Sequence, residues 1–569
     1  MIPSPLRPMH SSLSDRLSFC GAGQAWTILA VGFLCFADSA IRWPVPAANE
    51  PHYLTMARHH WDPAWCRRDL FLESTPAHTV FYQTLGIATR LLTLEQTAWL
   101  GRILAFSLFS LGWVRLCRRL ALDGPAPIGA ILVYLILASS GNFSGEWIIR
   151  GCEAKVFSYG LVLLAISFTM DRRWIPAAAL WGAAISFHTL VGIWALLAMT
   201  LAEILCRWNF PRRRVPLTDP RASIELAEIP AHAADRRLPW LFATLVITVT
   251  ALPGLLSALT LLWSGDAQQQ YQATYIHVFY RLAHHLDPMA FSITNYCYAG
   301  GLIAVWLCGR RWIDSTPARQ LFSRFIGISI VLALVGIAIG WGPRPAGDMP
   351  GFAWRMALLK FYPFRLFDGM MPIASAIAIV QIAQTVSRRL SATFTIVGTI
   401  VCFALWGFSL ADARRDEHPS RMSKQHLAEW QDICDWIDRQ TPAEALFITP
   451  NHNWGFRWYA ERAEFVSLKD CPQDAPHLVE WNRRLKLIAR WSEQSFPDGY
   501  SEDELLRFQQ MSGADYLLAQ RLGPIDLVPI YRNSMYRLYR LPRPQAAESA
   551  PAIIQNPHPI PLPQAGEGE

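Results

Sequence analysis

Long apolar runs alternate with polar segments through the first 410 residues of the chain. Each run has the length and hydropathy of a membrane helix, or of a slightly shorter helix in a bundle. The runs cover about residues 25–41, 98–116, 126–141, 156–170, 175–187, 190–206, 238–263, 292–308, 321–341, 366–386 and 392–410. The pattern predicts a membrane all-α fold, with about 11 transmembrane helices in a domain that covers residues 25–410.

The apolar stretch from 175 to 206 is interpreted as a helical hairpin. Arg172 precedes it, and three consecutive Arg follow it at 212–214. Clustered Arg is typical of cytoplasmic turns. Both ends of the stretch can therefore be cytoplasmic if two short helices turn near His188.

With this hairpin, the Arg-rich turns all fall on the side of residues 1–24, so that segment is predicted to be cytoplasmic. The first run could be a signal peptide, but Asp38 within it and the spans that follow favour a retained helix. We expect a multi-pass protein of a bacterial inner membrane. Its outer side would carry the large loop 42–97, the segments 142–155, 264–291 and 342–365, and everything after residue 410.

From about residue 414 the sequence becomes typical of a water-soluble domain. Apolar residues at helical spacing predict a helix that stops at Pro442, and SEDELLRFQQM predicts another. The runs ALFITP, EFVSLKD, ADYLLAQ and MYRLYRL have β-strand composition. The pattern predicts a small extracytoplasmic α/β domain over residues 414–541, followed by a disordered Pro-rich tail over 542–569.

The composition is that of a membrane protein, with 52% hydrophobic residues and a mean hydropathy of +0.19. The net charge of +7 is spread over short Arg clusters, so no nucleic-acid partner is expected. The 11 cysteines are scattered, which indicates neither a zinc site nor a disulfide framework. Cys434 and Cys471 are the pair that could form a disulfide outside the cytoplasm.

The first outer loop carries the candidate catalytic residues. An enzyme that acts on a lipid-linked donor needs a carboxylate base, cations for phosphate and aromatic side chains for its acceptor. Glu50 follows the first predicted helix closely and could lie at the membrane surface, so it is the first candidate for the base. His52 and Asp69 are secondary catalytic candidates. Alternatively, all three are ordinary solvated loop residues.

The second outer loop places Glu146, Arg150, Glu153 and Lys155 close together in sequence. On a short helix, the first three would lie along one face. Arg150 and Lys155 are candidates to bind a donor phosphate, with the two acids orienting them. The alternative is that these four residues simply pair with one another.

The fourth outer loop, LLKFYPFRLFD, brings Lys360, Tyr362 and Arg365 to the start of a span. The positive-inside rule disfavours basic residues on the outer side of a membrane. Cations at head-group depth can neutralise a lipid phosphate, while aromatic neighbours contact its prenyl chain. These residues are therefore predicted to bind a lipid phosphate; snorkelling anchors are the alternative.

The third outer loop contains His277, His284 and His285, but no clear acid partner, so no metal ligands are assigned. His188 is interpreted as structural. The chain has no Walker loop, Rossmann fingerprint, Gly-x-Ser-x-Gly elbow or His-Glu-x-x-His motif. This argues against cytosolic nucleotide hydrolysis.

The order of these features resembles the GT-C superfamily of integral membrane glycosyltransferases. The resemblance implies a polyprenyl-phosphate sugar donor and a catalytic acid just after the first helix, which corresponds to Glu50 in NEPHYL. Asn49 stands where a second acid is common, so a divalent metal is implied only weakly. NEPHYL, SFHTLVG and LLKFYPFRLFD are more closely similar to segments of an uncharacterised family of large bacterial membrane proteins.

We therefore expect a membrane glycosyltransferase whose donor enters from the membrane lipid. It would transfer a sugar to a glycan, lipid or protein acceptor on the outer face. One alternative is a transporter or flippase of a lipid-linked glycan, which predicts inverted repeats and charges in mid-span. Another is a non-catalytic membrane scaffold that binds a partner through its C-terminal domain.

Overall fold

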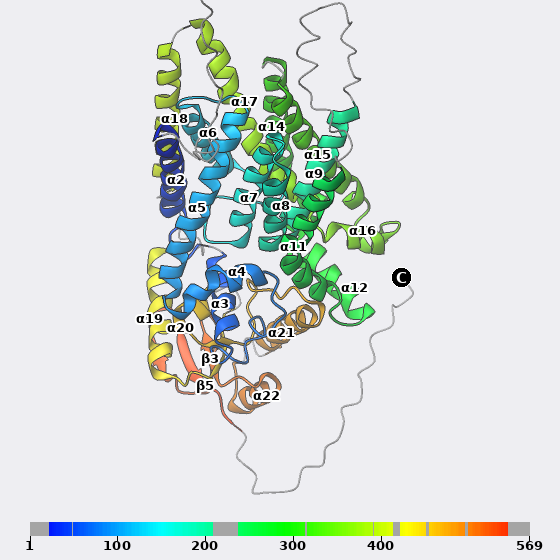
Figure 1. The fold of residues 1–569 in the computed structure, drawn as a ribbon. Helices are drawn as coiled ribbons and strands as arrows, with labels where there is room; N and C mark the ends of the chain where they lie inside the picture. Colours follow the sequence, from blue (N-terminus) through cyan, green and yellow to red (C-terminus); the bar gives the residue numbers. More distant parts are fainter. Residues whose placement is uncertain are drawn as a thin grey trace, which may run out of the picture.

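The computed structural model describes residues 22–47, 49–208, 237–312, 316–390, 392–413, 422–450, 454–494 and 499–543. A bundle of helices forms one end of the molecule, and a smaller mixed domain lies at the other end (Figure 1). The predicted cytoplasmic segment 1–24 and the predicted tail 542–569 lie almost wholly outside the described residues.

Each of the apolar runs forms a helix. These helices are α2 (Ala22–Arg42), α5 (Leu94–Arg119), α6 (Ala126–Ser140), α7 (Ala154–Met170), α8 (Trp174–Phe187), α9 (Thr189–Trp208), α11 (Arg237–Leu262), α14 (Ile293–Trp312), α15 (Pro317–Gly340), α17 (Arg365–Leu390) and α18 (Ala392–Ala413). Within the described residues, six helices are long and apolar enough to span a membrane, and four more are apolar but shorter. The predicted fold class is confirmed: the chain is a helical membrane protein with a small α/β domain.

The apolar stretch 175–206 forms two helices, as the Arg residues at its ends predict. α8 and α9 meet at His188, where the chain turns. Gly182 lets α8 approach α11 closely, because a Cβ at that position would lie 1.9 Å from Thr250 Oγ1. Small residues commonly allow membrane helices to associate in this way.

Short helices occupy the polar segments at the domain end of the bundle. They are α3 (Glu50–Trp61), α4 (Thr79–Gln83), η1 (Leu85–Arg90), α12 (Ala267–Tyr275), η3 (Ile276–Arg281), α13 (Ala283–Leu286), η4 (Pro288–Ala290), η5 (Ala346–Asp348) and α16 (Phe352–Leu359). Pro51 lies in the first turn of α3, where its missing N–H costs no helical hydrogen bond. The predicted first loop therefore contains three short helices.

The segment 146–153, whose charged residues would share one face if it were a short helix, forms no helix, although all of these residues are described. Gly145 just before it has φ +76°, in the left-handed region, which turns the chain away from a helical path. The segment folds instead around Asp368 of α17, whose carboxylate accepts the backbone N–H groups of Phe143, Ser144 and Glu146. The local spacing of charges did not indicate this distant partner.

A five-stranded sheet forms the centre of the C-terminal domain. Its strands are β1 (Leu446–Ile448), β2 (Ala463–Glu464), β3 (Tyr516–Ala519), β4 (Tyr531–Arg532) and β5 (Arg537–Arg540), in the order β2-β1-β3-β5-β4. β1 is parallel to β2 and β3, whereas β5 is antiparallel to β3 and β4. The domain helices are α19 (Lys424–Gln440), α20 (Phe456–Ala460), α21 (Ala475–Gln494) and α22 (Glu502–Ser512).

Alternate residues of the strands pack on opposite faces of the sheet, as strand geometry requires. Phe447 belongs to one apolar cluster with Trp430 of α19, while Leu446 belongs to another that includes Leu485 of α21. The helix predicted to end before Pro442 is confirmed in α19.

Two finer expectations for this domain fail. The run EFVSLKD contributes no more than its first residue to a strand, because β2 ends at Glu464. Cys434 and Cys471 are free thiols, so the candidate disulfide is absent.

A buried ionic cluster joins the C-terminal domain to the first polar segment. Nη1 of Arg457 in α20 donates to both carboxylate oxygens of Asp69, at 3.1 and 2.9 Å, and Nη2 donates to Asp470. His52 Nδ1 in α3 lies 3.0 Å from Asp470 Oδ1. Burial alone would raise the pKa of the Asp470 carboxyl, but Arg457 and His52 hold that pKa well below its usual range.

Arg457→Ala is expected to destabilise the chain by about 3–5 kcal/mol, because the change removes the guanidinium that pairs with the buried carboxylates of Asp69 and Asp470 and leaves only His52 in contact with Asp470. Thermal unfolding of the detergent-purified chain measures the effect, together with protease digestion of the C-terminal domain. Arg439→Ala is the matched control, since Arg439 forms an exposed ion pair with Asp435 and should leave both readouts unchanged. An unchanged midpoint in Arg457→Ala would show that the cluster does not hold the domain.

Candidate functional site

A cavity of about 870 Å³ lies where the helix bundle meets the C-terminal domain. Helices α9, α11 and α15 form its apolar wall, through Leu190, Ile193, Leu197, Leu255, Leu259, Leu262, Leu332, Val335 and Ile339. Ile193, Leu197 and Val335 are exposed. This wall therefore presents an apolar surface that no other part of the described chain covers.

The other end of this cavity is polar. Lys360, Tyr362 and Arg365, all predicted to bind a lipid phosphate, line it together with His188 and His277. Gln473 and Ala475 of the C-terminal domain complete the lining. A molecule in the cavity would thus contact apolar membrane helices at one end and cations beside the C-terminal domain at the other.

The turn between α16 and α17 brings the two cations to the same cavity. Tyr362 has φ +54°, a left-handed conformation that non-glycine residues rarely adopt. Its backbone N–H bonds to Leu359 O, and Arg365 N–H bonds to Tyr362 O, so the turn is held at both ends. Trp194 of α9 donates Nε1–H to Phe361 O at 2.7 Å and fixes the turn against the apolar wall.

Arg365 is at the centre of a chain of polar contacts. Its Nη1 donates to His188 Nε2 at 3.2 Å, and its Nε lies 3.1 Å from Glu146 Oε2. The guanidinium carbon lies 3.9 Å from the centroid of the Tyr362 ring. Such planar stacking and forked donation suit an arginine that binds an oxyanion.

Two histidines at the polar end remain neutral at physiological pH. Burial, followed by the charge of nearby His52, lowers the pKa of His78 to about 3. Burial, followed by the charge of Arg281, lowers the pKa of His277 to about 4. The positive charge that an anion would meet in the cavity therefore comes from Arg365 and Lys360.

Lys155 and Arg150 lie outside the cavity lining. Lys155 Nζ is 3.6 Å from Glu146 Oε1 and 3.4 Å from Glu153 Oε2, so it joins the polar network behind Arg365. The Arg150 guanidinium lies between two indoles, 4.1 Å from the Trp43 ring and 4.0 Å from the Trp147 ring. The structure therefore brings Lys360, Tyr362 and Arg365 together in one cavity and leaves Arg150 apart. The phosphate-binding roles of these four residues and of Lys155 stay predictions.

Glu50 occupies a different environment from the expected membrane surface. Its side chain is fully buried and pairs with Arg102 of α5, whose Nε and Nη2 donate at 2.7 and 2.8 Å. The N–H groups of Ala47 and Cys152 donate to the same carboxylate. Gly151 is required beside it, because a Cβ there would lie 3.0 Å from Glu50 Cδ. All the hydrogen-bonding capacity of Glu50 is directed into the protein.

His52 and Asp69, the secondary catalytic candidates, also lie apart from the cavity lining. Both belong to the ionic cluster that holds Arg457 and Asp470 of the C-terminal domain. Asp69 Oδ1 further accepts the N–H groups of Phe71 and Leu72. In this arrangement the two residues join the domain to the bundle, and a catalytic role for either stays a prediction.

Sequence reasoning missed Arg102, Tyr53 and His78. Arg102 had a visible signal, because a charged residue within an apolar run normally needs a buried partner. Tyr53 and His78 line the cavity and contact each other, with Tyr53 Oη 3.4 Å from His78 Nε2. Their positions in the sequence gave no sign of this contact.

No three His, Cys, Asp or Glu side chains within the described ranges come together in an arrangement that could hold a metal ion. The residues present do not fit a divalent cation, and no reaction step is assigned to one.

Comparison with known proteins gives a match to one family model and matches to solved structures. Residues 428–488 match the family model "Domain of unknown function (DUF6798)", which covers the start of the C-terminal domain. Two crystal structures of ArnT from Cupriavidus metallidurans, one bound to undecaprenyl phosphate and one in the apo state, each cover 91% of this chain and 98% of their own. No curated protein matches the sequence.

The two ArnT structures are 13% and 14% identical to this chain, each with a TM-score of 0.38. Similarity at this level does not bear on the ligand or the reaction of this chain.

Glu50→Gln is expected to lower stability by about 3–5 kcal/mol, because it leaves Arg102 as a buried charge without a counter-ion. The double variant Glu50→Leu/Arg102→Leu removes both charges and should recover most of the loss. The thermal unfolding midpoint of the purified chain is the readout, and Glu73→Gln at an exposed position is the control. If Glu50→Gln keeps the wild-type midpoint but loses activity, Glu50 is a catalytic base after all.

Proposed function

We propose that the chain is a GT-C-like glycosyltransferase that transfers a sugar from a polyprenyl-phosphate donor to a hydroxyl group of a glycan, lipid or protein acceptor. The observation that carries the proposal is the two-ended cavity, with membrane helices forming its apolar wall and Arg365 and Lys360 at its polar end. We place the reaction on the outer face of a bacterial inner membrane, where the C-terminal domain would lie.

The cavity suits the two chemical parts of such a donor. A prenyl chain is apolar and could enter from the bilayer along α9, α11 and α15, with no need for a water-filled path. A phosphate group is anionic and would be held by the guanidinium of Arg365 and the ammonium of Lys360. The Tyr362 hydroxyl, 3.2 Å from His277 Nε2, offers a further hydrogen bond.

In the proposed reaction, the acceptor oxygen forms a bond to the anomeric carbon as the bond from that carbon to the donor phosphate oxygen breaks. The electron pair leaves with the polyprenyl phosphate, whose added charge Arg365 and Lys360 stabilise. The proton of the acceptor hydroxyl passes to a carboxylate.

We assign the proton acceptor to Glu146 in place of Glu50. The Glu146 carboxylate contacts Arg365 through Oε2, so it lies beside the proposed phosphate site. Its Oε1 has no hydrogen-bond partner within the described part of the chain and lies 3.6 Å from the Lys155 ammonium. Glu50, by contrast, accepts four hydrogen bonds and has no free acceptor direction.

Lys360→Ala with Arg365→Ala should weaken binding of a polyprenyl phosphate at least about tenfold, because each cation contributes a charge-assisted contact. Polyprenyl phosphate is the leaving group common to all such donors, so the sugar need not be known. Arg355→Ala is the matched control, since Arg355 lies on α16 and donates to Ile339 O and Trp341 O. Equal affinity in the double variant and the control would contradict the phosphate site.

Glu146→Gln should abolish sugar transfer and leave binding of polyprenyl phosphate within about threefold of wild type, because the amide keeps its contact with Arg365 but cannot take a proton. Glu153→Gln is the comparison, since Glu153 also contacts Lys155 but accepts hydrogen bonds from Trp147 and Asn49. Transfer rates under saturating donor separate the two variants. Full activity in Glu146→Gln would remove it as the base.

A further inference from the structure

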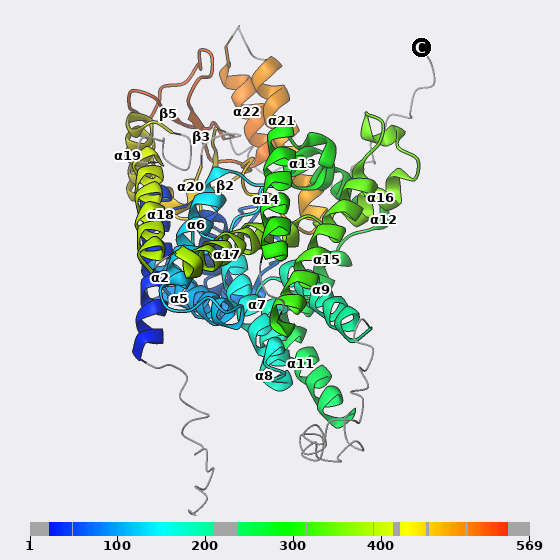
Figure 2. The same cartoon turned by 90° about the horizontal axis from the view of Figure 1, so that it is seen from above.

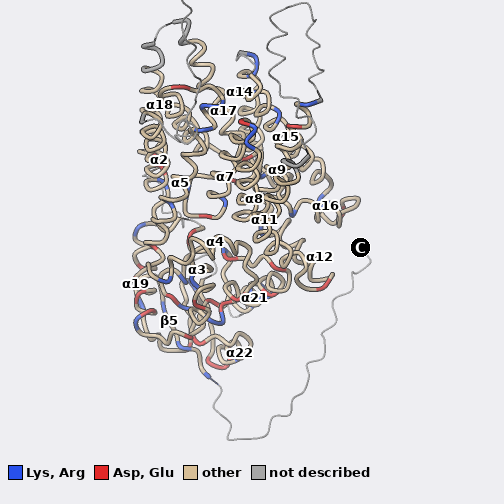
Figure 3. The backbone as a smooth tube through the Cα atoms, viewed as in Figure 1, with Lys and Arg blue, Asp and Glu red and all other residues tan. Residues whose placement is uncertain are grey.

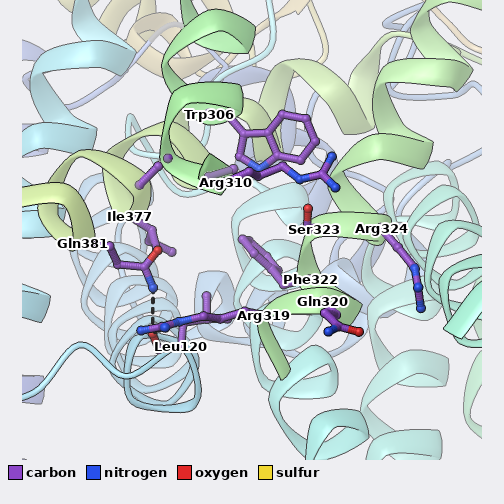
Figure 4. Close-up of a pocket in the computed structure, with 13 residues that line it drawn as sticks. Leu120, Trp306, Arg310, Arg319, Gln320, Phe322, Ser323, Arg324, Ile377 and Gln381 are labelled. Carbon is purple, nitrogen blue, oxygen red and sulfur yellow. Dashed lines mark hydrogen bonds between the residues drawn. The ribbon is translucent and has the colours of Figure 1, made fainter. Parts of the chain in front are cut away.

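A second cavity, of about 380 Å³, lies toward the opposite end of α15 (Figure 4). Of α15, this cavity is lined by residues between Arg319 and Arg324, whereas the first cavity is lined by Leu332, Val335 and Ile339. At about 1.5 Å per residue, about 12 Å of helix separates Arg324 from Leu332. The second cavity is therefore a separate feature, at the end of the bundle away from the C-terminal domain.

The charged side chains that line this second cavity are all cationic. Arg310 of α14 and Arg319 and Arg324 of α15 contribute to it, and none of its lining residues within the described ranges is a carboxylate. No ion pair joins Arg310 or Arg324 to a described residue, although Arg310 lies over the Trp306 ring, 5.1 Å from the ring centroid. Cations gathered around a hollow without acids favour an anionic ligand.

Polar groups in the same cavity are buried without partners. Ser323 Oγ and Arg324 Nη1 have no hydrogen-bond partner within the described residues. Buried donors of this kind are rare in folded proteins, and an unplaced ligand or ion is a common explanation. Figure 4 shows the Ser323 hydroxyl directed toward the Arg310 side chain, so both groups could contact one anion.

The floor of the cavity is fixed by two hydrogen bonds to one carbonyl. Gln381 Nε2 and Arg319 Nε both donate to Leu120 O, at 2.6 and 3.2 Å (Figure 4). These bonds join the end of α5 to α15 and α17. Phe322 and Ile377 supply an apolar side to the cavity. One side of this cavity is therefore fixed by hydrogen bonds, while arginines and apolar side chains line the rest of it.

We propose that this second cavity binds a phosphate group, carried either by the head group of an anionic membrane lipid or by a small soluble phosphate. Guanidinium groups recognise phosphate oxygens through paired N–H donors, and the Ser323 hydroxyl adds another donor. The site lies where α14 ends and α15 begins, and helix ends lie at head-group depth in a bilayer. Figure 3 shows further Lys and Arg at this end of the bundle, which would attract anionic head groups.

The test titrates the full-length chain, purified in an uncharged detergent, with phosphatidylglycerol, phosphatidylcholine or inorganic phosphate. Native mass spectrometry and the thermal unfolding midpoint report binding. The variant is Arg310→Gln/Arg324→Gln. Arg311→Gln is the matched control, because Arg311 carries the same charge one residue away and does not line the cavity.

We expect saturable binding of phosphatidylglycerol to the wild type and the control, at least about tenfold weaker in the double variant. The same pattern with inorganic phosphate in place of lipid would keep the site and assign a soluble phosphate. Equal binding by the double variant and the control, or no saturable binding by any probe, would overturn the proposal. Should the double variant fail to fold, Ser323→Ala replaces it and is expected to bind several-fold more weakly.

Discussion

A charge removed from water close to a membrane needs a partner of opposite charge, and the positions of such partners determine how this protein is assembled. The buried pair of Glu50 and Arg102 fixes the start of α3 against α5, at the boundary between the bundle and its polar cap. Arg457, held between Asp69 and Asp470, joins the C-terminal domain to that cap. Figure 2 shows the result from above, with α22, β3 and β5 gathered toward one side of the view and α19 near α18. These pairs are complete, so their main contribution is to position the parts of the molecule.

The polar end of the cavity lined by α9, α11 and α15 is different, because its charged groups can still form contacts with a bound molecule. Arg365 contacts Glu146, His188 and the Tyr362 ring, yet it lines an open cavity in which further oxyanion contacts can form. The completed pairs hold the surrounding elements still, and the open end can then bind an anion without rearranging them. A preorganised cationic end of this kind stabilises negative charge at little reorganisation cost. Under the proposed function, a prenyl chain would lie along the apolar wall of the same cavity, which is why we propose a lipid-linked donor and not a soluble one.

Local sequence patterns predicted the parts of the structure that depend on local properties. Apolar runs located the membrane helices, Arg at both ends of 175–206 revealed the hairpin, and basic residues on an unexpected side singled out Lys360 and Arg365. Patterns could not show which acids are buried, because Glu50 finds its partner 52 residues away and Asp69 finds its partner 388 residues away. The spacing of charges at 146–153 could not show the fold of that segment for the same reason, since Asp368 contacts it from a distant helix. The sequence therefore pointed to the cations of the candidate site. It favoured Glu50 as the base only because this residue closely follows a predicted membrane helix.

The most direct measurement is an electron cryo-microscopy structure of the chain in lipid nanodiscs that contain a polyprenyl phosphate. The account predicts lipid density in the cavity, with the prenyl chain along α9, α11 and α15 and the phosphate within hydrogen-bond distance of Arg365 and Lys360. Glu50 should remain paired with Arg102 in that structure. An empty cavity at saturating lipid, or a phosphate bound beside Glu50 instead, would contradict the account.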